Sequence, residues 1–417
     1  MSSIVLEPKR EKALLWLLAA VQFTNLMDYV IMMPLGPQFL RVFQITPAQF
    51  GTLVSAYAIA AGIAGVLAAA YLDRYDRRTV MLWLYGGFGV STLFCALAPN
   101  FAFLLAARTV AGAFGGVTGA LVIAIVGDIV PEERRGAGIG LVMASFSLAS
   151  VIGVPVGLVL ANHFGWHAPF FLLAASSFVL LVVMARQFPP LRAHLRDPGH
   201  NCHWAELGQV LTEGNHVRAF VFMGLLCFAA FAVIPFISPF MVKNVGFAEV
   251  HLPLLYLSGG LFTIFTTRWV GHLSDRHGTQ LVFRWFAVCA AVSILLLTNL
   301  PPVHEAVVIA TTTVFMICMS GRMVPAMAIL SMSVEPRRRG AFMSLNSSVQ
   351  HLSSGLAAFV SGLILHESAG RLENYAVIGW MAAAMMVCCL PLAARVRKVS
   401  TVHASDREIV EQADAPA

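Results

Sequence analysis

The 417-residue sequence has little charge: Asp, Glu, Lys and Arg make up only 12% of it, whereas 58% of its residues are hydrophobic. Its mean hydropathy is +0.78. A soluble globular chain carries about twice this share of charged residues. The shortage of charge therefore excludes a soluble protein and makes lipid the solvent for most of the chain.

Other absences exclude further classes of protein. No G-x-x-x-x-G-K-[S/T] segment occurs, so ATP bound in such a loop is not the energy source, and no cofactor is expected. The seven cysteines are odd in number and lie mostly in apolar runs, which argues against a disulfide framework. The segment His200 to His203 matches no common zinc spacing, so no metal site is expected.

Long apolar runs recur from one end of the chain to the other. A bilayer core of ~30 Å requires about 20 apolar residues per helix. Backbone groups in lipid must be hydrogen-bonded internally, and these runs are too long for barrel strands. The sequence therefore predicts an all-α integral membrane protein with twelve transmembrane helices. The predicted spans are 13–38, 48–72, 79–98, 101–127, 137–163, 167–187, 217–243, 248–273, 281–299, 303–333, 341–366 and 373–397.

The basic residues predict the orientation of these spans. If the N-terminus is cytoplasmic, 21 of the 27 Lys and Arg residues lie in cytoplasmic segments, as is typical of membrane proteins. Both termini are therefore expected in the cytoplasm, with the chain in the inner membrane. The net charge of +6 then reflects topology rather than nucleic-acid binding. The outer loops are short and almost without charge, which argues against a membrane-bound enzyme.

The chain also contains an internal duplication. Asp275 and Arg276 follow Asp73 and Arg74 at an offset of 202 residues, and the loops PEERRG and EPRRRG match at an offset of 204. Two matches at nearly the same offset indicate two parallel six-helix bundles. We expect a monomer with an N-terminal bundle, a cytoplasmic linker, a C-terminal bundle and a disordered cytoplasmic tail. The expected boundaries are 1–187, 188–216, 217–397 and 398–417.

On these motifs the sequence resembles the major facilitator superfamily of secondary transporters, most closely its drug and arabinose-efflux-permease-like branches. The family signature Gly-x-Leu-x-Asp-Arg-x-Gly-Arg-Arg is matched over eight positions by GHLSDRHG, whereas the first copy has Ala69 and Asp76 in place of glycines. The signature residues are Asp73, Arg74, Arg77 and Arg78 in the first copy and Gly271, Asp275, Arg276 and Gly278 in the second.

Two further motifs support the resemblance. Span four carries the family's Arg-x-x-x-Gly at Arg108 and Gly112. Span five carries GVPVG, with Gly153, Pro155 and Gly157, which is similar to the proline-glycine motif of the family's antiporters. The strict motif has two glycines where this chain has Leu158 and Val159, so the match favours antiport without establishing it.

The resemblance implies a role for the charged loop after span two. In the family, the loop aspartate, here Asp73, meets the N-terminal end of span eleven. The resemblance also pairs Arg77 with Asp128 when the cytoplasmic side is closed. The loop would then hold that side shut. The alternative is that its arginines only fix topology. The duplicated aspartate favours the closing role, because topology requires no acid.

Ionisable residues inside spans are costly and mark functional sites. Asp28 lies ~14 Å and Arg108 ~10 Å below the outer ends of their spans, so we expect them to pair. The alternative is a static ion pair that only fixes packing. Arg322 in span ten has no obvious acid in a neighbouring span, which favours an anionic or carbonyl-rich solute.

Span eleven is unusually polar. Four of its side chains fall within one ~100° stripe, which we expect to face water or a ligand. His351 lies near the middle of the bilayer and is either a hydrogen-bonded interior residue or a proton carrier. Span four has glycines at helical spacing that would let another helix approach closely. The stripe consists of Ser347, Gln350, His351 and Ser354, with Asn346 beside it. Gln22 and Asn25 of span one would form a similar polar wall in the other half. The glycines of span four are Gly112, Gly115, Gly116 and Gly119.

Together these features predict a secondary transporter that exports a small organic solute, drug-like, sugar or metabolite, in exchange for protons. Asp28 is the leading proton-binding residue, with Arg108 and His351 as its partners in coupling. The alternatives are an exporter of siderophores or other anionic metabolites, a symporter or uptake facilitator, and a membrane sensor on the same fold.

Overall fold

The computed structural model describes residues 7–71, 74–131, 134–191, 204–335 and 338–399. Asp73, residues 192–203 of the linker, which include His200 to His203, and the tail beyond residue 399 lie outside the described residues. Eleven described helical segments are long and apolar enough to cross a membrane. A twelfth helix, α15 (Arg339–Ile364), has a similar length but carries the polar residues of span eleven. The prediction of twelve membrane helices is confirmed.

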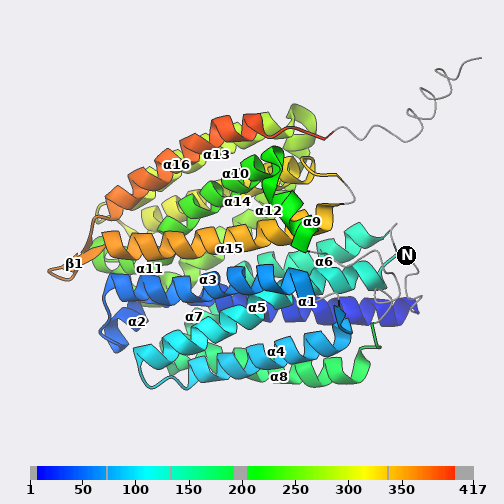
Figure 1. Ribbon diagram of the computed structural model, residues 1–417. Coiled ribbons are helices and arrows are strands. Elements are labelled where there is room, and N and C mark those ends of the chain that lie inside the picture. The colour runs from blue at the N-terminus through cyan, green and yellow to red at the C-terminus, as the bar shows by residue number, and fades with distance from the viewer. Residues whose placement is uncertain (1–6, 72–73, 132–133, 192–203, 336–337, 400–417) are drawn as a thin grey trace, which may run out of the picture.

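The first half of the chain supplies six membrane segments, which lie together in the lower part of Figure 1. The fifth segment contains a short π-helix, η2, just before Pro155. The elements are α1 (Pro8–Ile31), α2 (Gly36–Val42), α3 (Pro47–Tyr71), α4 (Arg77–Ala96), α5 (Phe101–Ile129), α6 (Arg135–Leu148), η2 (Ala149–Gly153), α7 (Val154–Phe164) and α8 (His167–Gln187).

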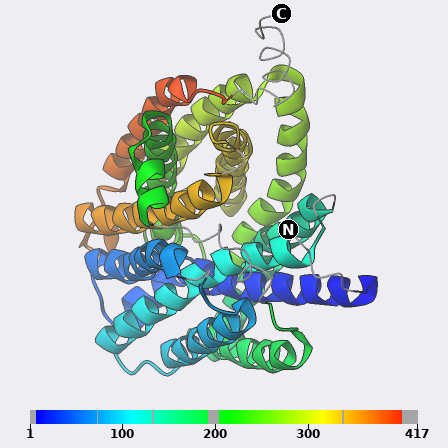
Figure 2. The same ribbon diagram turned by 45° about the vertical axis from the view of Figure 1, so that its right-hand side comes forward.

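The second half supplies the other six, which lie together in the upper part of Figures 1 and 2. A short helix, α9 (Trp204–Thr212), precedes them. The elements are α10 (Gly214–Val233), η4 (Ile234–Phe236), α11 (Ile237–Phe240), η5 (Met241–Val245), η6 (Glu249–His251), α12 (Leu252–His277), α13 (Thr279–Thr298), α14 (Glu305–Ser331), α15, β1 (His366–Ser368), β2 (Arg371–Glu373) and α16 (Tyr375–Arg395).

Three predicted span boundaries are wrong. The first span was expected to run to residue 38, but α1 ends at Ile31 and a turn leads into α2. Pro34 explains the break, because proline lacks an N–H and its ring clashes with the carbonyl four residues earlier. The predicted spans 341–366 and 373–397 would make residues 366 and 373 helical. Instead β1 and β2 form an antiparallel hairpin there.

The halves of the chain meet along α3 and α15, which lie side by side in Figure 1. Glycines allow this approach. A Cβ on Gly51 would lie 2.6 Å from the carbonyl oxygen of Ala358, and one on Gly362 would lie 3.0 Å from that of Pro47. A second contact joins α12 to η2, where a Cβ on Gly260 would lie 2.9 Å from the Ser150 carbonyl oxygen.

We name the two ends of the helix bundle after the elements that lie there. The hairpin side holds α2 and the β1–β2 hairpin, and the terminal side holds the start of α1 and the end of α16 (Figure 1). The halves also touch on the hairpin side, where the rings of Phe50 and Phe236 lie 5.7 Å apart. An ion pair there joins Arg41 of α2 to Glu249 of η6, at 2.8 Å.

Candidate functional site

The buried charges of the first half meet between α1 and α5. Arg108 Nη1 donates to Asp28 Oδ2 at 2.7 Å and to the Asp28 carbonyl oxygen at 3.2 Å. The hydroxyl of Thr92 lies 3.5 Å from Asp28 Oδ1. The Asp28 side chain is 0% exposed and that of Arg108 is 1% exposed. Two charges this far from water require each other, because either one alone would be strongly destabilising.

An aromatic ring covers the arginine of this pair. The guanidinium carbon of Arg108 lies 4.3 Å from the ring centroid of Tyr57 on α3, within the range of a cation–π contact. The Tyr57 hydroxyl donates to Asn25 Oδ1 at 3.1 Å, and Asn25 Nδ2 donates to the Gly115 carbonyl oxygen at 2.9 Å. Asn25 thus orients the ring that covers Arg108, rather than forming an open polar wall.

A second tyrosine extends this cluster toward the other half of the chain. The ring of Tyr29 stacks on that of Tyr57, with centroids 5.2 Å apart. It also contacts the rings of His351 on α15, at 6.0 Å, and Phe231 on α10, at 5.9 Å. An unbroken series of side-chain contacts therefore runs from Asp28 to His351, across the boundary between the halves. We call Asp28, Arg108, Tyr57, Tyr29 and His351 the central cluster.

Tyr29 and Tyr57 were not singled out in the sequence. Both lie in apolar runs, where aromatic residues are common and carry no distinctive spacing. The available signal was the hydroxyl group, because a buried tyrosine usually finds a polar partner. That signal does not identify the partner, which for Tyr57 is Asn25 on α1.

The glycines of α5 explain how Tyr57 comes so close. A Cβ on Gly112 would overlap the backbone of Tyr57, and one on Gly116 would lie 2.6 Å from the Cα of Ala61. A Cβ on Gly115 would overlap the Tyr57 hydroxyl. Gly119 differs, because its nearest neighbours would be the amide groups of Asn25 and Gln22 at 3.6 to 3.8 Å.

Glycines of the fifth span admit α1 in the same way. A Cβ on Gly153 would lie 2.7 Å from Met27 Sδ, and one on Gly157 would lie 2.7 Å from Ile31 Cδ1. Pro155 is buried in the first turn of α7. These residues pack against the helix that carries Asp28.

The polar residues of α15 are only partly satisfied by the protein. Ser354 donates to the Gln350 carbonyl oxygen at 2.6 Å. Asn346 is 1% exposed, and its Oδ1 has no hydrogen-bond partner among the described residues. On α1, the buried Oε1 of Gln22 likewise has no partner there. Such acceptors favour a polar ligand or water. Ser347, Gln350 and His351 are half-buried.

Arg322 is buried in the second half without an acid. Its side chain is 1% exposed, and Nη1 donates to the Leu226 carbonyl oxygen at 3.1 Å. Nε and Nη2 both point at Met319 Sδ, at 3.3 and 3.1 Å. In the described part of the chain, no carboxylate forms an ion pair with Arg322.

The first copy of the loop signature forms a dense polar network on the terminal side. Arg77 Nη1 lies 2.7 Å from Asp128 Oδ2 and donates to the Ala124 carbonyl oxygen at 3.0 Å. Arg78 Nη2 donates to the Ala185 carbonyl oxygen at 2.7 Å. Asp73 lies outside the described residues, so its expected contact with span eleven remains a prediction.

Asp76, which replaces a family glycine, has a local function in this network. Its Oδ1 accepts from the backbone N–H of Arg78 at 3.1 Å and therefore caps the start of α4. The same oxygen accepts from the N–H of Leu191 at 3.0 Å. It thereby fixes the first residues of the linker to the first half.

The second copy of the signature is more open. Asp275 and Arg276 are exposed, and no atom would lie within 4 Å of a Cβ on Gly271. Gly278 has a φ of +87° and ends α12, a conformation that favours glycine. Arg74 is also exposed, and its guanidinium lies 5.4 Å from the Tyr71 ring centroid.

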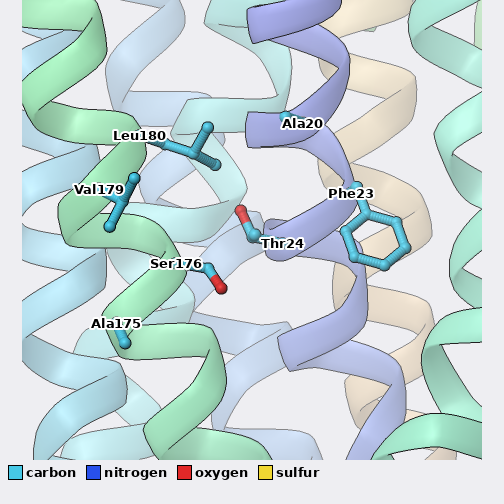
Figure 3. A pocket seen from close by; sticks show the side chains of 7 residues that line it. All are labelled: Ala20, Phe23, Thr24, Ala175, Ser176, Val179 and Leu180. Carbon is cyan, nitrogen blue, oxygen red and sulfur yellow. The ribbon is translucent and has the colours of Figure 1, made fainter.

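A hollow of about 450 Å³ between α1 and α8 is not a good solute site. Its hydroxyl groups are already paired, since Thr24 bonds to Tyr85 at 2.7 Å and Ser176 donates to the Leu172 carbonyl oxygen at 2.7 Å. No charged residue lines it, so it suits an apolar chain better than a polar solute. Figure 3 shows its lining: Ala20, Phe23, Thr24, Ala175, Ser176, Val179 and Leu180.

Comparisons with known proteins agree with this architecture. Over 397 residues the chain is 23% identical to the MFS-type transporter YceJ of Bacillus subtilis (strain 168), covering 94% of this chain and 98% of that protein. Over 251 residues it is 26% identical to YtbD of the same organism, covering 60% and 62% of the two chains.

Solved structures show the same fold. The D-xylose-proton symporter superposes with a TM-score of 0.73 at 15% identity, covering 93% of this chain and 99% of that one. The inward-facing, occupied structure of a bacterial homolog of the human lysosomal transporter Spinster gives a TM-score of 0.74 at 15% identity, covering 95% and 100%. The sequence profile of the major facilitator superfamily matches residues 18–319 and 219–416. This chain is therefore a multi-pass membrane protein that belongs to the major facilitator superfamily of transporters.

Proposed function

We propose that the protein is a secondary transporter of the inner membrane that exports a small organic solute in exchange for protons. Asp28 would carry the proton. The observation that supports this proposal best is the fully buried pair of Asp28 and Arg108, linked by aromatic contacts to the second half of the chain. A pair that served packing alone would not require contacts across the moving boundary.

The contacts of Arg108 allow Asp28 to change its protonation state. While Nη1 of Arg108 holds Oδ2 at 2.7 Å, the carboxylate is stabilised in its ionised form. If the carboxylate takes up a proton, Arg108 retains the Asp28 carbonyl oxygen and the face of Tyr57 as partners. Protonation therefore does not leave the guanidinium without any partner. The state in which the ion pair is broken thus remains accessible.

The aromatic part of the cluster supplies a route for coupling. Tyr29 packs against Tyr57 in its own half and against His351 and Phe231 in the other. A movement of one half relative to the other must repack Tyr29 and hence the ring that covers Arg108. One acid then has two proton affinities in two conformations, which is the requirement for exchange. His351 is the second titratable group on this route.

Transport by reconstituted protein tests the proposal. We would incubate proteoliposomes with D-xylose, ethidium or citrate, representing a sugar, a cationic drug and an anionic metabolite. Accumulation of the solute would be measured under an imposed pH gradient. We expect Asp28→Asn to abolish accumulation against a gradient while retaining downhill exchange of the same solute. Thr24→Ser, on the same helix and with the hydroxyl that bonds to Tyr85 retained, is the matched control and should retain uphill transport. Equal accumulation by Asp28→Asn and the wild type would refute the role of Asp28, and His351→Gln would be tested next.

Proton symport is the second candidate, because one of the similar structures is a D-xylose-proton symporter. The direction in which the solute moves under a given pH gradient distinguishes antiport from symport. Under antiport the solute moves in the direction opposite to the flow of protons, and under symport it moves in the same direction as the protons. A protein that binds a solute but shows no counterflow would instead be a sensor built on this fold.

A further inference from the structure

The two halves of the chain hold their buried arginines in the same way but with different partners. Arg108 lies in the fourth span of the first half, and its Nη1 donates to a backbone carbonyl of the first span, that of Asp28, at 3.2 Å. Arg322 lies in the fourth span of the second half, and its Nη1 donates to a carbonyl of that half's first span, that of Leu226, at 3.1 Å. At the position where the first half has the carboxylate of Asp28, the second half has the apolar side chain of Leu226.

The remaining donors of Arg322 face a weak acceptor. Nε and Nη2 together form the edge of the guanidinium that binds a carboxylate or phosphate through two parallel hydrogen bonds. Here both atoms point at one sulfur, Met319 Sδ. A thioether is a poor acceptor and offsets no charge. Met319 therefore occupies the place that an oxyanion would take, on a flexible side chain that can be displaced.

From this arrangement we infer that Arg322 binds an anionic group, a carboxylate or phosphate, of the transported solute. The inference rests on the proposed transport function, because the solute is the source of the anion. Burying a cation among apolar helices without a counter-ion is costly. An incoming anion would remove that cost and would replace the Met319 sulfur at the Nε and Nη2 edge. The first half then handles the proton and the second half recognises the charge of the solute.

Anion binding by the purified full-length chain in detergent micelles is the direct test. The probes are benzoate and inorganic phosphate, with benzamide as a neutral analogue of benzoate, in a buffer free of other carboxylates and phosphate. A ligand that binds only the folded protein raises its unfolding midpoint. We expect benzoate or phosphate, but not benzamide, to raise the midpoint of the wild type. Arg322→Gln should weaken the apparent affinity by about tenfold to a hundredfold, as expected for lost charge-assisted hydrogen bonds.

A charge built into the site makes the test sharper. Leu226→Asp places a carboxylate where the first half has Asp28, so it should pair with Arg322 and abolish the anion response. Leu226→Asn has the same size without the charge and should retain most of the response. If Leu226→Asp does not fold, Met319→Leu replaces it. That change removes the sulfur from the anion's position and should strengthen the response.

The inference is overturned if neither anion shifts the wild type, or if Arg322→Gln responds as the wild type does. These measurements need no transport, so they separate two failures. Anion binding without movement of any solute under a proton gradient would refute the proposed function and leave the anion site in place. Proton-driven transport without an anion response would do the reverse.

Discussion

The ion pair between Arg41 and Glu249 should help to hold the two halves together on the hairpin side. Arg41 Nη1 lies 2.8 Å from Glu249 Oε2, and Nη2 lies 3.4 Å from Oε1, so the contact is bidentate. The side chains are 65% and 20% exposed, so solvent screens the pair. Exposed pairs contribute about 0.2–1 kcal/mol. We call molecules closed when the two halves touch on the hairpin side and open when they are apart there. Losing this ion pair should lower the ratio of closed to open molecules by about 1.4-fold to fivefold.

Charge reversal and restoration measure this effect. Arg41→Glu sets two carboxylates against each other and should favour separation of the halves, as should Glu249→Arg. The double variant exchanges the charges and should return the distance distribution to that of the wild type. Spin labels on cysteines introduced at Val42 and Val250, both exposed, would report the distance by pulsed electron resonance. The native exposed cysteines are replaced by serine in all samples.

Two controls separate pairing from general disturbance. Lys243 and Glu367 form an ion pair within the second half, so Glu367→Gln should leave the distance between the labels unchanged. The difference between Arg41→Glu and the wild type should shrink in 1 M salt, where the screening length is about 3 Å. A double variant that stays as open as the single variants would refute the reasoning, because local damage rather than pairing would then explain the opening.

Two further predictions concern the first half. Gly112→Ala should strongly destabilise the protein, because its Cβ would overlap the backbone of Tyr57, whereas Gly119→Ala, on the same helix with more room, should be tolerated; thermal unfolding in detergent compares them. Asp128→Asn should cost more stability than an exposed pair would, because both Arg77 and Asp128 are largely buried at their 2.7 Å contact. An unchanged unfolding midpoint would contradict this second prediction.

The number of membrane helices was predictable because lipid imposes one solution on an apolar run. A span in lipid must satisfy its own backbone, so length and composition suffice to find it. The errors occurred where the chain leaves the apolar core. Pro34 divides the first predicted span into α1 and α2, and the hairpin around Ala369 and Gly370 replaces expected helix ends. Both depend on local turn chemistry that an apolar average conceals.

The site was predictable only in part, and for a physical reason. Charges inside a membrane are rare, so Asp28, Arg108 and Arg322 stand out in the sequence alone. Tyr29 and Tyr57 do not stand out, because aromatic residues are ordinary in spans and their importance comes from contacts between helices. The pair of Arg41 and Glu249 was missed for the same reason. In the sequence Arg41 is an isolated charge in a short predicted loop and Glu249 lies at the start of a predicted span, and their 208-residue separation gives no sign that they meet.

The duplication clarifies why one half carries an acid and the other does not. Two copies that remained equal would each neutralise their own arginine, and neither would attract a charged solute. In this chain the shared feature is the backbone contact of the arginine, and the difference lies in one side chain, Asp28 against Leu226. Placing a carboxylate at both positions would satisfy both arginines internally. On the proposed mechanism, the single acid would therefore let one half exchange a proton and the other accept a charge from outside the protein.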